Sequence, residues 1–120
     1  MFAGRRCRFR ALEDTGNELI DPLSGDGVLV VSAAALAPLF PGQNALLEAE
    51  AAEALELFAD AYPGRFRLLA AQCAGGRTLL LCFRPDALRL DGKVRRDLLV
   101  GVSPQRLSAD GRFDALVRAE

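Results

Sequence analysis

The dipeptide Asp91-Gly92 constrains the fold more than any other feature of this sequence. It lies between Leu88-Arg89-Leu90 and Val94, two short segments that carry apolar residues. An Asp-Gly pair readily takes the positive φ angles of a tight two-residue turn. The pattern therefore predicts a β-hairpin.

A second hairpin is predicted around Cys73-Ala74-Gly75-Gly76. This glycine-containing segment separates two largely apolar runs, residues 65–72 and 77–83. Leu98-Leu99-Val100 is a further apolar segment of strand length. The C-terminal half of the chain is thus expected to be mostly β.

The N-terminal part also contains strand signals. Apolar residues alternate with arginines along 6–11, a period of two that predicts a strand with one buried face. The turn-forming groups 14–17 and 21–27 follow, and Val28 to Val31 is a short, β-branched strand. These elements predict a small, mainly antiparallel β domain.

Helical signals are fewer. Ser32 can cap a short helix over Ala33–Leu36. Residues from Asn44 to Tyr62 carry an apolar stripe at helical spacing, with acidic residues on the opposite, solvated face. Phe113 to Arg118 is predicted to form a short C-terminal helix.

Length and charge narrow the range of functions. The 120 residues suit one domain, 1–120, and Lys+Arg 15 against Asp+Glu 16 leaves no basic surplus for nucleic-acid binding. The basic cluster of Arg5, Arg6, Arg8 and Arg10 is interpreted as the solvated face of a strand. No apolar run is long enough to span a membrane, so the chain is expected to be soluble.

Missing residue types exclude several kinds of chemistry. The sequence has no histidine, which rules out Ser-His-Asp catalysis and His-ligated zinc within one chain. Cys7, Cys73 and Cys82 are far apart and are expected to be buried, reduced thiols. No glycine-rich phosphate-binding motif is present. We expect no metal and no cofactor, so acid–base work is left to carboxylates, Lys, Arg or the one tyrosine, Tyr62.

One tripeptide carries a carboxylate that is suited to acid–base catalysis. Asp14-Thr15-Gly16 follows a predicted strand and precedes a turn. Aspartic peptidases hold two carboxylates so close together that they share one proton, one acting as base on a water and the other polarising the scissile carbonyl. A glycine beside each carboxylate lets two such loops approach. An ordinary turn is the alternative for a lone Asp-Thr-Gly.

The segment that contains this tripeptide resembles a known family. Ala11-Leu12-Glu13-Asp14-Thr15-Gly16-Asn17-Glu18-Leu19-Ile20-Asp21-Pro22-Leu23-Ser24-Gly25 is similar to the D-[ST]-G-N-x-L-x-D-P-x-[ST]-G signature of the sporulation sigma-E factor processing peptidases. The strand Val28–Val31, the glycine pair and the closing segments 98–103 and 107–116 also fit this family. The likeness covers nearly the whole chain.

The resemblance implies a retropepsin-like antiparallel β-barrel, mainly β, with an inserted helical segment. It implies an aspartic endopeptidase subunit that works as a homodimer, with Asp14 catalytic and Thr15, Gly16 and Asn17 in the supporting loop. Ala74, Gly75 and Gly76 would belong to a flap over the substrate, with an ordinary tight turn as the alternative. Glu13, in place of an apolar residue, is expected to point away from the cleft, because neighbours on a strand face opposite sides.

The resemblance also implies partners and a location. The substrate would be a pro-sigma factor that loses its pro-segment, and a secreted signalling protein would act as activator. The full-length protein would be anchored through a membrane domain absent from this chain and would act at the cytoplasmic face of the mother-cell membrane. A catalytically inactive binding or assembly module of the same fold is the main alternative, and a ligand-binding β-barrel is another.

Overall fold

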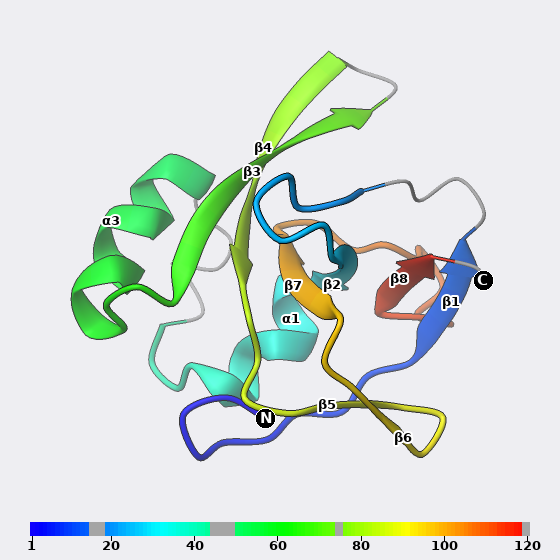
Figure 1. Ribbon diagram of the computed structural model, residues 1–120. Coiled ribbons are helices and arrows are strands. Elements are labelled where there is room, and N and C mark those ends of the chain that lie inside the picture. Colours follow the sequence, from blue (N-terminus) through cyan, green and yellow to red (C-terminus); the bar gives the residue numbers. More distant parts are fainter. Residues whose placement is uncertain (15–18, 44–49, 74–75, 119–120) are drawn as a thin grey trace.

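The computed structural model describes residues 1–14, 19–43, 50–73 and 76–118. Six strands form one sheet in the order β1-β8-β2-β7-β4-β3, and β5 and β6 form a separate two-stranded hairpin (Figure 1). The strands of the main sheet are β1 (Ala11–Asp14), β2 (Gly27–Ser32), β3 (Phe66–Cys73), β4 (Gly76–Phe83), β7 (Leu98–Ser103) and β8 (Ala115–Arg118).

The mainly β prediction is confirmed, but the sheet is open. β1 and β3 lie at its two edges, and the β1–β8 and β2–β7 ladders are parallel. The sheet therefore differs from the closed antiparallel barrel that the resemblance implies. Parallel neighbours need long connections, and here the β2–β7 connection runs through the helices, β3 to β6 and their loops.

Both predicted hairpins are confirmed. β5 (Leu88–Leu90) pairs with β6 (Lys93–Arg95), and the turn has φ of 50° at Asp91 and 78° at Gly92. Two successive positive φ angles are the signature of the tight hairpin turn expected for Asp-Gly. β3 and β4 pair in antiparallel register from Phe66↔Phe83 to Cys73↔Gly76.

The helices cover one face of the sheet. The short helix α1 (Ala33–Leu36) follows Ser32 as predicted, although the Ser32 side chain makes no capping hydrogen bond, and the 3-10 helix η1 (Ala37–Leu39) continues it. The inserted helix α3 (Ala51–Ala61) lies inside the predicted range 44–62, of which 44–49 fall outside the described residues.

The predicted C-terminal helix is wrong, because this segment forms β8. Ala115 is fully buried in the larger apolar cluster and the partly buried Val117 packs against it, whereas Leu116 packs against the smaller cluster on the other face. This two-residue alternation suits a strand. β8 also bonds β1 on one edge and β2 on the other, and this pairing outweighs the helical preference of so short a segment.

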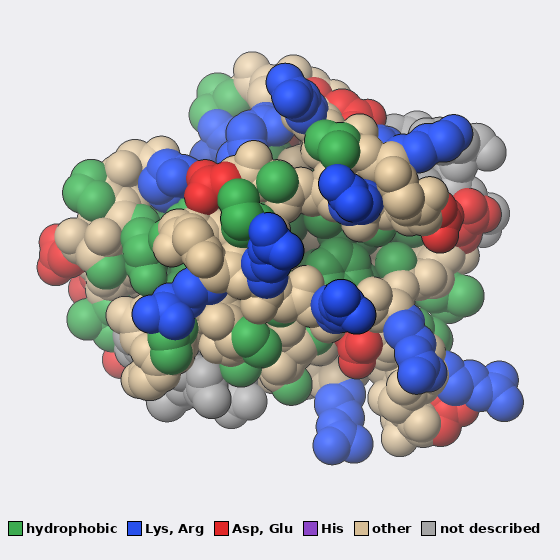
Figure 2. Space-filling view, turned by 90° about the horizontal axis from the view of Figure 1, so that it is seen from below, with side chains coloured by type: hydrophobic (Ala, Val, Ile, Leu, Met, Phe, Trp, Pro, Cys, Tyr) green, Lys and Arg blue, Asp and Glu red, His purple; other side chains and the backbone are tan. Residues whose placement is uncertain are grey.

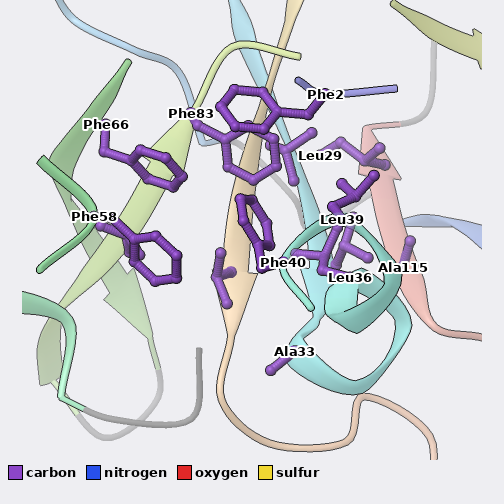
Figure 3. Close-up of a cluster of buried hydrophobic side chains, with 14 of the residues drawn as sticks. Phe2, Leu29, Ala33, Leu36, Leu39, Phe40, Phe58, Phe66, Phe83 and Ala115 are labelled. Carbon is purple, nitrogen blue, oxygen red and sulfur yellow. The ribbon is translucent and has the colours of Figure 1, made fainter. Parts of the chain in front are cut away.

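An aromatic cluster forms the core between the sheet and its helices (Figure 3). The rings of Phe2, Phe40, Phe58, Phe66 and Phe83, which the figure labels, and that of Tyr62 contact one another with centroids 4.9–6.3 Å apart. Phe2 is fully buried in this cluster and has the Arg65 guanidinium 4.6 Å above its ring. The N-terminal segment is thereby held against the domain.

The predicted strand over residues 6–11 begins only at Ala11. Cys7 and Phe9 are half-buried and pack on the core, while the arginines between them are exposed. The predicted alternation of burial is therefore present along 6–10, but this stretch has no strand pairing.

Candidate active site

Asp14 is the last residue of β1, at an edge of the sheet. Its Cα pairs in register with that of Arg118 on β8, and its side chain is partly exposed. The start of β1 is fixed by Arg10, whose backbone carbonyl accepts hydrogen bonds from the N–H groups of Asp114 and Ala115, at 2.8 and 3.1 Å. Asp14 thus lies at the end of an anchored strand, whereas the sequence predicted it in the turn just after a strand.

Glu13 and Asp14 face opposite sides of β1. Glu13 lines a groove of about 770 Å³ on the side of the β5–β6 hairpin, and Asp14 is not among the residues that line it. This groove is therefore not the candidate active site. Because Glu13 points into this other groove, its charge is directed away from Asp14, as expected for neighbours on a strand.

The rest of the predicted site falls mostly outside the described residues. This holds for Thr15, Gly16, Asn17, Ala74 and Gly75. Gly76 is described as the first residue of β4, opposite Cys73 at the far end of the β3–β4 hairpin. In Figure 1 this end of the hairpin and the end of β1 both point away from β5 and β6.

Asp21 organises the turn that follows the candidate site, a role that the sequence did not predict. Its carboxylate is 2% exposed and accepts hydrogen bonds from the N–H groups of Leu23 and Ser24, both 3.2 Å long, and from the Ser24 hydroxyl at 2.6 Å. Its own N–H donates to the Asp26 carbonyl at 2.8 Å. The sequence Asp-Pro-x-Ser-Gly is a common turn motif, and it could have indicated that the Asp21 side chain organises this turn.

Two ion pairs join this turn to the β3–β4 hairpin. Arg67 of β3 donates a hydrogen bond to the Asp21 carboxylate, and Arg84, just after β4, binds Asp26 at 2.7 Å. Burial acts to raise the pKa of Asp21, but the hydrogen bonds from Ser24 and Leu23 and the Arg67 charge outweigh it, so the pKa is lowered. Asp21 is therefore a buried carboxylate held in its charged form.

The two cysteines whose side chains are described, Cys7 and Cys82, do not form a reactive site. Cys7 and Cys82 are free thiols, and burial raises the pKa of both, that of Cys82 to about 12. A thiol with so high a pKa is a poor nucleophile at neutral pH. Nothing is described of the Cys73 side chain, and no group of three or more Cys, Asp or Glu among the described residues is placed to hold a metal ion.

Comparison with known proteins decides the family. The model of peptidase family U4, described as sporulation factor SpoIIGA, matches residues 1–120. The chain belongs to this family. It is also 32% identical over 117 residues to the sporulation sigma-E factor-processing peptidase of Bacillus subtilis (strain 168), an alignment that covers 90% of this chain.

The family assignment confirms the resemblance seen in the sequence. The alignment spans only 38% of the Bacillus subtilis protein, so this chain corresponds to a part of that relative. No solved structure matches the fold. None of the described helices is long and apolar enough to cross a membrane.

Proposed function

We propose that this chain is the catalytic domain of an aspartic endopeptidase that works as a homodimer. The observation that carries the proposal is the position of Asp14, the aspartate of the chain's one Asp-Thr-Gly, at the end of a sheet-edge strand in a peptidase-family domain. A single copy supplies one such aspartate, and the mechanism needs two carboxylates. Two copies related by a twofold axis supply both.

In this mechanism the two Asp14 carboxylates lie close enough to share one proton. The ionised one removes a proton from a bound water as the water attacks the peptide carbonyl, and the protonated one donates a hydrogen bond to the carbonyl oxygen. Thr15 and Gly16 form the loop that supports the carboxylate, with Asn17 completing it. The absence of a side chain at Gly16 lets the two loops approach across the axis.

The open edge of the sheet supports this dimer. Within the described chain, β1 pairs only with β8, so its outer edge is available to a second copy. Leu12 of β1 is 47% exposed and Ile20, in the next segment, is 44% exposed. Burial of these apolar side chains would favour an interface beside Asp14.

The β3–β4 hairpin is the proposed flap. Its two strands pair over eight residues each, up to Cys73↔Gly76, and in the sequence Ala74 and Gly75 connect them. Adjacent glycines allow the backbone conformations that a mobile hairpin end requires. The ion pairs of Asp21 and Asp26 with Arg67 and Arg84 would then join the base of this flap to the segment after Asp14.

The relative's name supports the choice of substrate. We propose that this protein removes the pro-segment of a sporulation sigma factor, as expected for a protein related to a sigma-E factor-processing peptidase. The full-length protein would be anchored in the mother-cell membrane through a further domain, act at its cytoplasmic face and respond to a secreted activator.

The test is co-expression of the full-length protein with its candidate pro-sigma factor, followed by immunoblotting for the shortened product. Asp14→Asn is expected to reduce processing to background without loss of the folded protein. Glu13→Gln is the matched control, because it neutralises the neighbouring carboxylate on the opposite side of β1. Retained processing by a folded Asp14→Asn protein would contradict the proposal and favour an inactive binding or assembly module.

A further inference from the structure

A groove lies on the side of the molecule that carries β5 and β6 and reaches Glu13 of β1, but Asp14 does not line it. Its volume is about 770 Å³, and its walls are the extended N-terminal segment 6–9 and the β5–β6 hairpin. Figure 2 views this side and shows apolar side chains in a hollow surrounded by Lys and Arg. The groove is separate from the proposed catalytic site.

The interior of the groove is apolar. Leu36, Leu88 and Val100, which come from three different elements, lie at its base, and the half-buried Phe9 and the 53% exposed Val94 line its walls. Apolar surface of this kind gains free energy when another apolar side chain excludes water from it. The groove can therefore accept an apolar residue from a partner.

The charged side chains of the lining are mostly basic. Four arginines, Arg6, Arg8, Arg89 and Arg95, line the groove together with two acids, Glu13 and Asp91. Arg95 is paired with Asp97 at 2.8 Å. Among the residues that the structure describes, Arg6, Arg8 and Arg89 make no ion pair, so three cations at the groove are available to an anionic partner.

The N-terminal wall also offers free backbone groups. Arg6, Cys7, Arg8 and Phe9 all line the groove, although alternate side chains of an extended segment face opposite sides. The groove therefore runs along the backbone edge of this segment. In the described chain, the N–H and C=O groups of residues 7–9 make no hydrogen bond, so this edge can pair with an added strand.

We propose that this groove binds an extended, acidic peptide segment of a partner protein. The segment pairs with the free backbone edge of residues 7–9, places an apolar side chain against Phe9 and Val94, and directs its carboxylates to Arg6, Arg8 and Arg89. This binding site does not depend on Asp14 or on the proposed peptidase activity.

The probe is a fluorescein-labelled peptide of six residues in which Glu and Leu alternate. The control is a labelled peptide of the same length in which Lys replaces Glu, so that its charge is reversed. Fluorescence anisotropy is measured against the purified protein. The acidic peptide is expected to bind, and its affinity is expected to fall as the salt concentration is raised, because salt screens exposed charge pairs. The basic peptide is expected to bind at least about tenfold more weakly.

Variants at the groove locate the site. Arg6→Glu/Arg8→Glu/Arg89→Glu is expected to weaken acidic-peptide binding at least about tenfold, and so is Val94→Asp, through loss of the apolar contact. Arg106→Glu and Leu57→Asp are the matched controls, since both alter exposed side chains outside the groove and should leave affinity unchanged. Circular dichroism checks that every variant is folded.

Several results would overturn the proposal. These are no binding of the acidic peptide at millimolar protein, or equal loss of binding in the groove and control variants. Binding to phosphatidylglycerol vesicles that the groove variants abolish, without peptide binding, would assign the surface to a membrane instead. Self-association lost in the groove variants, again without peptide binding, would assign it to a second copy of this chain.

Discussion

Asp21 and Arg67 form an ion pair between the turn after the candidate site and a strand 46 residues further along the chain. The Asp21 side chain is only 2% exposed, while that of Arg67 is 36% exposed. The pair therefore joins a buried carboxylate, already held by three hydrogen bonds within its own turn, to the β3–β4 hairpin.

The first prediction is that Asp21 contributes strongly to stability. Asp21→Ala removes the acceptor for two backbone N–H groups, the Ser24 hydroxyl and Arg67, and should lower the free energy of unfolding by about 2–4 kcal/mol. Asp26→Ala is the matched control, because it breaks a more exposed pair with Arg84 and should cost about 0–1 kcal/mol. Urea unfolding of the three proteins measures both changes; equal losses would contradict the role assigned to Asp21.

The second prediction concerns acid. The pKa of Asp21 is lower in the folded state than its ordinary value of 3.8, so its charged form stabilises the fold fully above that value. This contribution is lost as the pH falls through the folded-state pKa. The stability difference between the wild type and Asp21→Asn should therefore be constant at neutral pH and shrink as the pH falls below about 4. A difference that grows in acid would contradict the lowered pKa.

The third prediction is that Gly101 is required for close packing in the sheet. A Cβ atom at this position would lie 3.0 Å from Cγ1 of Val28 and 3.5 Å from Sγ of Cys82. Gly101→Ala should therefore destabilise the domain by about 1–3 kcal/mol. In Gly27→Ala the new atom would meet only the end of the Leu98 side chain, at 3.2 Å, and this variant should cost less. Thermal unfolding compares the two, and the reverse order would show that the strands can separate to admit the methyl group.

The fourth prediction is that catalysis needs no metal. The sequence offers no histidine and no cysteine pair for a metal site, and the proposed mechanism uses carboxylates and water alone. Chelators should leave processing by the full-length protein unchanged, whereas a transition-state mimic of aspartic peptidases should inhibit it. Activity lost in chelator and restored by zinc would refute this expectation.

Local signals in the sequence predicted the hairpins well. Asp91-Gly92 specifies its turn through the backbone angles of two adjacent residues, and the β3–β4 segments need only a short connection to pair. Asp14 was predicted to follow a strand from the alternation along 6–11, but of that stretch only Ala11 belongs to β1.

Pairing between distant segments was harder to predict from the sequence. The last strand, β8, was predicted as a helix because the local sequence of residues 113–118 does not indicate that β1 and β2 pair with it. The parallel β2–β7 ladder joins segments far apart in the chain, and so does the Asp21–Arg67 pair. Patterns in a single sequence report local periodicity, and they do not indicate which distant segments pair in the fold.

The most direct test of the proposed mechanism is a subunit-mixing experiment with the full-length protein. Wild-type and Asp14→Asn subunits are co-expressed at increasing ratios of variant to wild type, and the rate of pro-sigma factor processing is measured per wild-type subunit. If two Asp14 carboxylates form one active site, mixed dimers hold a single aspartate, and the rate per wild-type subunit should fall toward zero as the variant is added in excess. A rate per wild-type subunit that stays constant, with mixed dimers demonstrated by differential tagging, would contradict the shared site.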